Sequence, residues 1–280
     1  MTSLAKRLIL TFTSVPALFI LIFFFPQMNH LAFAVLVFLS VLTGTYEMRN
    51  ISMRKEEKPL LPFWATGLLP ISEYIHLSFL PVLPLTEFCL FSLFLIAYAR
   101  EIKRGAYDDF EHTLHRISHI SFLIIYPGFF SIFLIKLLVY PQSRFLVVML
   151  FLLVFGNDIF AYVFGMLFGK NNRGVFKVSP NKSIAGFLGG MLMTIVLSVV
   201  WVLIIPSMYE LFTLWQAALL GLIIALSSDI GDLIESAFKR GAKVKDAGKI
   251  ILGRGGLMDS IDSLVASAPI FLLFVATIIG

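Results

Sequence analysis

Residues 145–168 read FLVVMLFLLVFGNDIFAYVFGMLF, an apolar run in which Asp158 is the only charged side chain. A helix that crosses a bilayer needs about 20 largely apolar residues, because the hydrocarbon core is about 30 Å thick. We therefore expect this segment to cross a membrane as one helix. Comparable segments elsewhere bring the predicted total to about nine spans. The others are approximately 8–25, 31–46, 60–80, 84–99, 119–140, 184–206, 211–235 and 263–279.

The composition favours an integral membrane protein over the other protein classes. Of the 280 residues, 59% are hydrophobic and only 14% are charged, and the mean hydropathy is +0.92. Soluble domains carry about 25% charged and about 45–50% apolar residues, so this chain has too little polar surface to cover a globule. The single cysteine, Cys89, excludes an intramolecular disulfide. We predict an all-α polytopic membrane protein.

The positive charges predict the orientation of the chain. If the N-terminus is cytoplasmic, every Lys and Arg except Lys136 and Arg144 falls in a segment on the cytoplasmic side. Such a bias is the usual sign of membrane orientation, and an odd number of spans places the C-terminus outside. Because the cations face one membrane surface, the net charge of +5 indicates contact with membrane lipids and not with nucleic acid.

The two halves of the chain differ in where their acids lie. In the first half, the acids that approach the spans are Glu47, Glu73 and Glu87, all near span ends. In the second half, acids occur inside spans, and the loops are rich in Gly and Lys. We therefore divide the chain into a structural part, residues 1–140, which faces lipid or forms a homodimer, and a catalytic part, residues 141–280.

Residues 227–240, SSDIGDLIESAFKR, carry a first pair of acids inside an apolar segment. A charge within a span costs at least about 2.5–3.5 kcal/mol, so charged residues there usually mark functional sites. The alternative is that the helix has already left the bilayer and the acids are solvated, which fits Glu235 better than Asp229. At about 100° per residue, one helical face holds Asp229, Asp232, Ser236 and Lys239.

A second pair, Asp259 and Asp262, stands at the start of the last apolar run, with Asp246 shortly before it. One of these acids is easily explained as a helix cap, but several converging carboxylates repel one another unless cations intervene. Mg²⁺ prefers oxygen ligands and typically binds one or two carboxylates together with substrate phosphates. We predict a site for two Mg²⁺ ions. The candidate ligands are Asp229, Asp232, Asp246, Asp259 and Asp262.

Two loops have the composition of phosphate-binding segments. Residues 245–256, KDAGKIILGRGG, combine Gly-rich backbone with cations, which lets amides and side chains approach a phosphate. A flexible connection is the alternative, and the pattern is not a Walker A loop. The other loop follows the span 145–168 and contains Ser179, Lys182 and Ser183. Within that span, Asp158 next to Asn157 is interpreted as functional or as paired with a cation.

A group of histidines has a simpler explanation than metal binding. On one face of a predicted helix lie Asp108, His112, His115 and His119. This spacing is compatible with a transition-metal site. The apolar residues on another face favour an amphipathic helix that lies on the cytoplasmic membrane surface.

Residues 236–262 resemble the signature of the phosphatidate cytidylyltransferases, or CDP-diacylglycerol synthases. That signature runs S-x-x-K-R, K-D, P-G-H-G-G and D-R-x-D. This chain has SAFKR at 236–240, KD at 245–246, LGRGG at 252–256 and DSID at 259–262. Residues 179–186, SPNKSIAG, resemble the family pattern S-P-K-K-[ST]-x-E-G, and Asn157-Asp158 resembles its upstream acid. The departures from the family pattern are Asn181, Ala185, Leu252, Arg254 and Ser260.

The resemblance implies an enzyme of phospholipid synthesis that joins phosphatidate to CTP and releases pyrophosphate. Its partners would be CTP, phosphatidate and membrane lipids, with Mg²⁺ as cofactor. Its place would be the plasma membrane of a bacterium, with the site facing the cytoplasm. The implied catalytic residues are Asp229, Asp232, Asp246 and Lys239. The implied substrate contacts are Asn157, Asp158, Ser179, Lys182, Ser183, Arg240, Lys245, Arg254, Gly255 and Gly256. Arg254 would supply the cation that is missing at Ser260.

Three alternatives to this function stay open at the level of the sequence. A CTP-dependent lipid kinase, of the polyprenol or phytol type, would release CDP instead of pyrophosphate. A transporter would also place acids in spans, but it would move its substrate without turning over nucleotide. A catalytically impaired homologue is compatible with the departures from the family signature.

Overall fold

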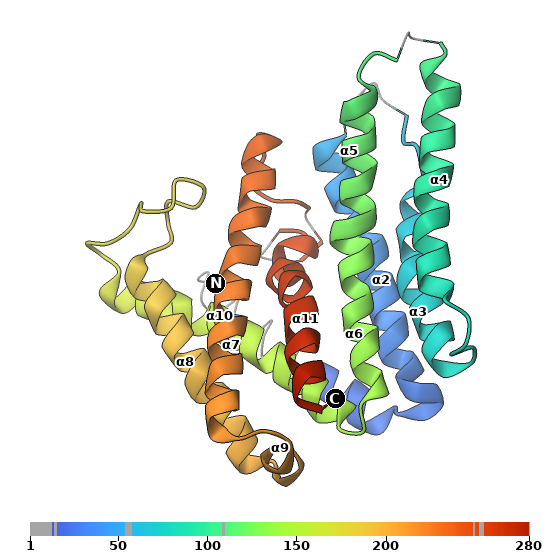
Figure 1. Ribbon diagram of the computed structural model, residues 1–280. Coiled ribbons are helices and arrows are strands. Elements are labelled where there is room, and N and C mark those ends of the chain that lie inside the picture. The colour runs from blue at the N-terminus through green and yellow to red at the C-terminus, as the bar shows by residue number, and fades with distance from the viewer. Residues whose placement is uncertain are drawn as a thin grey trace.

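The computed structural model describes residues 13, 16–53, 58–107, 110–248, 250–251 and 255–279. Throughout this part of the chain the regular elements are helices, and β-pairing is limited to the isolated bridges Arg173–Ser183 and Ile251–Gly255. Within the described residues, six helical segments are long and apolar enough to cross a membrane. These are α2 (Gln27–Ser52), Thr113–Val139, α7 (Ser143–Phe168), α8 (Ile184–Ile204), α10 (Leu214–Gly241) and α11 (Met258–Ile279). Figure 1 shows how the helices are arranged. The predicted all-α class is confirmed.

The three other predicted spans are also helical in the described residues, but they are shorter or more charged. Residues 16–24 are helical, and residues 60–80 contain the 3₁₀-helix η1 (Phe63–Gly67) and the 11-residue helix α3 (Leu68–Ser78). Helix α4 (Leu85–Gly105) has 21 residues, with an acid in its first turn and two bases in its last. The total of nine spans therefore stays a prediction.

The segment Thr113–Val139 is an interrupted helix that begins outside the apolar region and continues into it. It consists of α5 (Thr113–Leu123), a π-turn η2 (Ile124–Gly128), η3 (Phe129–Ser131), α6 (Ile132–Lys136) and η4 (Leu137–Val139). Pro127 lies inside the π-turn, and a proline cannot donate the helical hydrogen bond of that position.

The amphipathic surface helix predicted around the histidines is wrong, because α5 leads directly into this span. His112 precedes the helix with a left-handed backbone, at φ 61°. His119 forms a hydrogen bond of 2.8 Å between its Nε2 and Ser52 Oγ on α2. Asp108 lies outside the described residues.

Helices α7, α8, α10 and α11 pack closely because small residues stand where they meet. A Cβ added to Gly186 on α8 would lie only 2.6 Å from the carbonyl oxygen of Ala161 on α7. A Cβ on Gly231 of α10 would lie 2.7 Å from the Ala266 Cβ on α11. Small residues let transmembrane helices approach at backbone distance. Of these four helices, α7, α10 and α11 carry all the predicted site residues that lie within helices.

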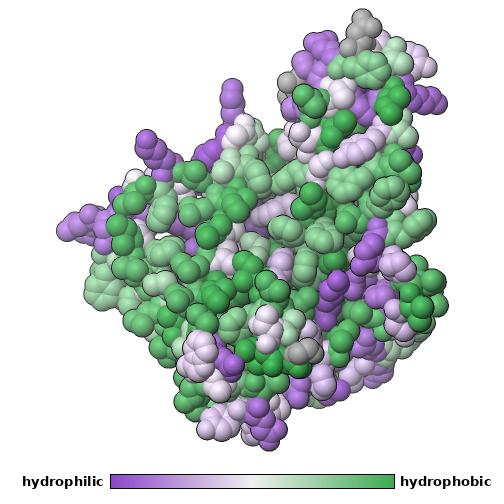
Figure 2. All heavy atoms as spheres, viewed as in Figure 1, coloured by the Kyte–Doolittle hydropathy of each residue, from purple (hydrophilic) through white to green (hydrophobic). Residues whose placement is uncertain are grey.

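The interior and the surface of the helices are both apolar, as expected for a protein surrounded by lipid. The main core joins the two halves of the chain, since buried side chains of α2, α6, α7, α10 and α11 belong to one cluster. On α8, large apolar side chains are exposed at four-residue steps, including Leu188, Leu192 and Val196. Figure 2 shows apolar residues across the middle of one face, and hydrophilic residues gathered at the tip formed by the end of α4 and the start of α5.

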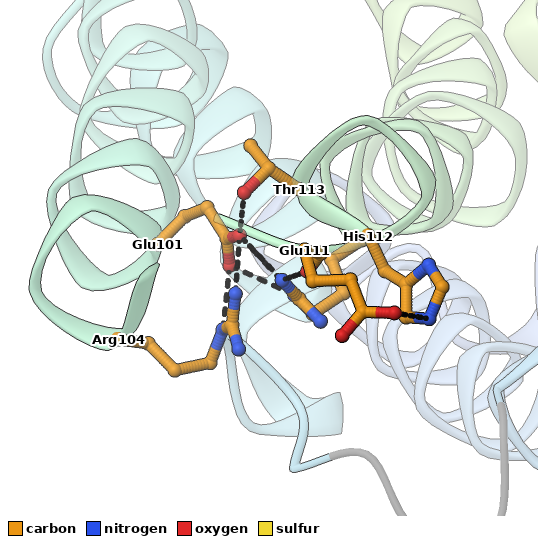
Figure 3. Close-up of polar contacts among 6 residues, drawn as sticks. Glu101, Arg104, Glu111, His112 and Thr113 are labelled. Atoms are coloured by element: carbon orange, nitrogen blue, oxygen red, sulfur yellow. Dashed lines mark hydrogen bonds and ion pairs between the residues drawn. The ribbon is translucent and has the colours of Figure 1, made fainter. Parts of the chain in front are cut away.

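A buried ion-pair network fastens α4 to α5 at this tip (Figure 3). Glu101 on α4 is 2% exposed and accepts hydrogen bonds from Arg104 Nε at 2.9 Å and from Thr113 Oγ1 at 2.7 Å. Arg116 on α5, which is also buried, donates to the same carboxylate through Nε and Nη2, at 3.2 and 3.1 Å. One carboxylate therefore holds both helices.

Replacing Glu101 with alanine should destabilise the protein strongly, because it leaves the buried Arg116 without its carboxylate. Breaking a buried pair costs about 3–5 kcal/mol in the free energy of unfolding. Unfolding in detergent measures this loss. The matched control is Glu111→Ala, since the Glu111 carboxylate forms an ion pair with His112 at 3.2 Å and its side chain is 73% exposed. Its effect should stay below about 1 kcal/mol, and equal stability of the two variants would contradict the role of Glu101.

Candidate functional site

Three carboxylates meet where α10 and α11 lie against each other. Asp232 and Glu235 come from α10 and Asp262 from α11, and each offers an oxygen within 4.8 Å of the others. Asp262 and Glu235 are buried, and Asp232 is half-buried. The close approach of the two helices at Gly231 brings these side chains together, because a Cβ there would lie 3.2 Å from the Asp262 carbonyl oxygen. We call Asp232, Glu235 and Asp262 the carboxylate cluster.

The expectation that Glu235 is solvated is wrong, because its exposure is 0%. Helix α10 continues to Gly241, and Glu235 lies on the side of it that faces α11. The i, i+3 step from Asp229 to Asp232 continues to Glu235, so the spacing places Glu235 near the same face of α10 but does not show that this face is buried. Its Oε1 accepts no hydrogen bond from the described residues, although Lys239 forms an ion pair with Oε2.

Lys182 covers one side of the carboxylate cluster from the loop that precedes α8. Its Nζ lies 2.7 Å from Asp232 Oδ2 and 3.7 Å from Asp229 Oδ1. Burial lowers the pKa of Lys182, but the nearby carboxylates of Asp232 and Asp229 outweigh this effect and raise its pKa above the ordinary value. The ammonium group is therefore charged at neutral pH, directly beside the acids.

Lys239 and Asp259 form a second pair, on the side of the site where α11 begins. Lys239 Nζ lies 2.6 Å from Asp259 Oδ1. The other oxygen of Asp259 accepts hydrogen bonds from the backbone N–H groups of Ala247, at 2.8 Å, and Gly256, at 2.7 Å. Asp259 thus joins α10 to the loop before α11, and it lies outside the carboxylate cluster. Its printed backbone donors precede it in the chain, so these contacts are not those of a helix cap.

The predicted acid of α7 faces the same region. Asp158 is near enough to Lys182, Asp229 and Asp262 to interact electrostatically with each of them. Its neighbour Asn157 is fully buried and accepts a hydrogen bond of 3.2 Å from Thr194 Oγ1 on α8. Helices α7, α8, α10 and α11 therefore contribute side chains to one polar region inside the protein.

The loop between α7 and α8 places the remaining residues of the SPNKSIAG segment. Ser183 is buried and caps α8, since its Oγ accepts from the Gly186 N–H at 3.1 Å. Ser179 is half-buried. Arg240, exposed at the end of α10, holds this loop through a hydrogen bond of 3.4 Å from Nε to the Val178 carbonyl oxygen.

The loop between α10 and α11 presents the residues that were predicted to bind nucleotide. Lys245 and Asp246 are exposed, and Asp246 lies outside the carboxylate cluster. Gly255 has φ +104°, which only glycine adopts readily, and a Cβ there would lie 2.9 Å from the Asp246 Cβ. Gly256 is buried. Arg254 lies outside the described residues, so its compensation for Ser260 stays a prediction.

One carboxylate from the first half of the chain reaches this loop, and the sequence did not indicate it. Glu47 lies on α2, is 3% exposed, and accepts hydrogen bonds from the backbone N–H groups of Leu257 and Met258. These partners follow it by 210 and 211 residues. A linear pattern does not reveal a contact over such a distance. The part assigned a structural role therefore touches the site.

Comparison with known proteins agrees with this arrangement of residues. A family model described as "Cytidylyltransferase family" matches residues 5–278. "Phosphatidate cytidylyltransferase" of Chlamydia pneumoniae is 31% identical over 249 residues, which cover 82% of this chain and 78% of that protein. "Uncharacterized protein YnbB" of Escherichia coli (strain K12) is 36% identical over 187 residues, covering 65% of this chain and 60% of that protein.

A further relative matches less than half of the chain. "Phosphatidate cytidylyltransferase" of Staphylococcus haemolyticus (strain JCSC1435) is 37% identical over 120 residues, which cover 43% of this chain and 45% of that protein. This chain thus spans between about half and about four-fifths of the lengths of these relatives. The resemblance that the motifs indicated is confirmed, and the chain belongs to the cytidylyltransferase family.

Proposed function

We propose that this protein is a phosphatidate cytidylyltransferase, which converts phosphatidate and CTP to CDP-diacylglycerol and pyrophosphate. The observation that carries the proposal is the carboxylate cluster with Lys182 and Lys239 on its two sides. Reactions that bring several phosphates together depend mainly on positioning and charge neutralisation. The names of the relatives from Chlamydia and Staphylococcus support the same reaction.

In the proposed reaction, an ionised phosphate oxygen of phosphatidate attacks the α-phosphorus of CTP. The bond between that phosphorus and the bridging oxygen breaks, and pyrophosphate leaves with the electron pair. Phosphatidate is already ionised, so the site needs no strong general base. Lys182 is placed to hold an attacking or leaving phosphate against the acids, and Lys245 and Arg240 are exposed where nucleotide arrives from water.

The carboxylate cluster fits Mg²⁺, because its three members offer only oxygen atoms, which this ion prefers. When bound by Asp232, Glu235 and Asp262, Mg²⁺ would offset the charge of the phosphates. Asp229 lies beside the cluster, 3.7 Å from Lys182 Nζ. Asp246 belongs to the loop between α10 and α11, and Asp259 accepts a hydrogen bond from that loop. We propose the cluster as the first choice of ligands and these three acids as the next.

We further propose nine spans in a bacterial plasma membrane, with the N-terminus and the site on the cytoplasmic side and the C-terminus outside. The end of α4, the start of α5 and the end of α10 lie at one end of the molecule, and the connection from α6 to α7 lies at the other (Figure 1). Lys136 and Arg144 belong to the second end, and the basic loops to the first. This asymmetry supports the orientation.

We also propose that the protein forms a homodimer through residues 1–140. The mass of the purified protein in detergent tests this proposal.

Purified protein, phosphatidate, labelled CTP and Mg²⁺ together test the function. We expect label from the cytidine and the α-phosphate to enter a lipid product, and pyrophosphate to appear in equal amount. Release of CDP with transfer of the γ-phosphate would instead identify a lipid kinase. Without nucleotide turnover, an impaired homologue or a transporter replaces the proposal, and flux across proteoliposomes separates these two.

A further inference from the structure

Both carboxylate oxygens of Glu47 accept hydrogen bonds at the start of α11, which is far from Glu47 in the sequence. Its Oε1 accepts from the Leu257 N–H at 3.0 Å, and its Oε2 accepts from the Met258 N–H at 2.9 Å. Among the described residues no Lys, Arg or His forms an ion pair with this carboxylate. Two consecutive backbone amides at a helix N-terminus are thus its partners, a favourable place for a negative charge.

Two glycines of the loop between α10 and α11 pack against the same carboxylate. A Cβ added to Gly248 would lie 2.7 Å from Glu47 Cδ, and a Cβ added to Gly256 would also lie 2.7 Å from it. At distances this short, a side chain at either position would displace the Glu47 carboxylate. The backbone of the loop packs directly on Glu47, and glycine at both positions allows this contact. Part of the glycine content of the loop is thus explained by packing on Glu47 and not by phosphate binding.

A continuous set of contacts joins Glu47 to the carboxylate cluster. The described part of the loop before α11, which Glu47 contacts, also donates backbone hydrogen bonds to Asp259 through Ala247 and Gly256. Asp259 in turn pairs with Lys239, and Lys239 pairs with Glu235 of the cluster. Glu47 thus fixes one end of a chain of polar contacts whose other end is the proposed metal site.

We propose that Glu47 is a positioning residue for cytidylyl transfer, which holds the loop before α11 and the first turn of α11 in the reactive arrangement. This inference rests on the proposed function. The first half of the chain then contributes to the chemistry and not only to the membrane scaffold. A residue that only stabilises the fold would change the fraction of folded protein without changing turnover per folded molecule.

The test compares Glu47→Gln with Glu47→Asp and with Glu73→Gln. Glutamine keeps the size but replaces one acceptor oxygen with an NH₂ group that faces an N–H donor. Aspartate keeps both acceptors and is shorter by one methylene. Glu73 is an equally buried carboxylate of the first half, 2% exposed on α3, and its ion pair is with Lys136 at 4.0 Å. It serves as the matched control.

We expect Glu47→Gln to lower kcat by about 10²-fold, because misplacement of a site by about 1 Å costs that much. The KM for phosphatidate should change little, Glu47→Asp should recover part of the turnover, and Glu73→Gln should leave kcat per folded protein unchanged. Gly248→Ala should lower kcat as Glu47→Gln does, and the double variant should lose little more, because contacting residues are not additive.

Hydrogen exchange at residues 246–258 gives a readout that does not depend on turnover. Glu47→Gln should speed exchange at the amides of Leu257 and Met258, and Glu73→Gln should not. Unchanged exchange would overturn the link from Glu47 to the loop. Faster exchange with unchanged kcat would overturn the positioning role. If the wild-type protein forms no CDP-diacylglycerol, the proposed function fails, and the exchange result still decides whether Glu47 holds the loop.

Discussion

Asp262→Asn should lower the Mg²⁺-dependent formation of CDP-diacylglycerol by at least about 10²–10³-fold, the usual cost of losing one group that stabilises developing charge. Asp262 is buried on α11 and lies within 4.8 Å of Asp232 and Glu235 on α10. Asparagine keeps the shape of the side chain but removes its negative charge. The protein should therefore fold and lose affinity for the cation.

Two measurements separate this outcome from a general loss of structure. Activity is measured over a range of Mg²⁺ concentrations, and Mn²⁺ binding is measured directly in the absence of substrate. Glu73→Gln, which neutralises a buried acid outside the site, should leave both unchanged. Asp246→Asn separately tests the exposed loop acid, which the family resemblance implied to be catalytic. If Asp262→Asn binds Mn²⁺ and turns over as the wild type does, the carboxylate cluster is not the metal site.

Lys182→Met should lower turnover by about 10²–10³-fold, because it removes the cation that lies between the loop before α8 and the acids of α10. Lys182 Nζ lies 2.7 Å from Asp232 and 3.7 Å from Asp229. Methionine retains most of the aliphatic length but cannot neutralise a phosphate. Steady-state kinetics with varied CTP and varied phosphatidate would show which substrate the lysine holds.

The same loop offers a matched control in Lys177, whose side chain is exposed. Lys177→Met removes an equal charge from the same membrane surface and should change turnover little. Lys182→Arg keeps the charge with a different geometry and should retain more activity than Lys182→Met. Equal activity of Lys182→Met and Lys177→Met would exclude a direct role for Lys182.

Much of this architecture was predictable, because both the membrane and the helix impose simple periodic rules. Long apolar runs identified the six helical segments of the described residues that are long and apolar enough to span a membrane, since a bilayer requires a minimum length of apolar helix. The i, i+3 spacing placed Asp229 and Asp232 on one face of α10. The motif resemblance identified the family and named Lys182 as a substrate contact. The structure places this lysine beside Asp229 and Asp232, and its role in substrate binding stays a prediction.

The parts that escaped prediction depend on contacts between distant segments. Whether Glu235 is solvated depends on how far α10 continues and on which side α11 packs, and neither follows from α10 alone. Glu47 stands at the end of a generic apolar segment, and its role arises only when residues 257 and 258 fold against it. The histidines suggested a separate surface helix, but α5 begins only at Thr113, after the left-handed His112, and it continues into the span that the sequence predicted at 119–140.

The close contact at Gly231 also bears on how the protein responds to its bilayer. Helices of fixed length adapt to a thicker or thinner membrane by tilting. Because α10 and α11 touch almost backbone to backbone, a tilt imposed on one is transmitted to the other, and the separation between Asp232 and Asp262 is preserved. The product of this reaction would enter the synthesis of the lipids that set membrane thickness. We expect a site held between two such closely packed helices to keep its geometry when the thickness of the surrounding bilayer changes.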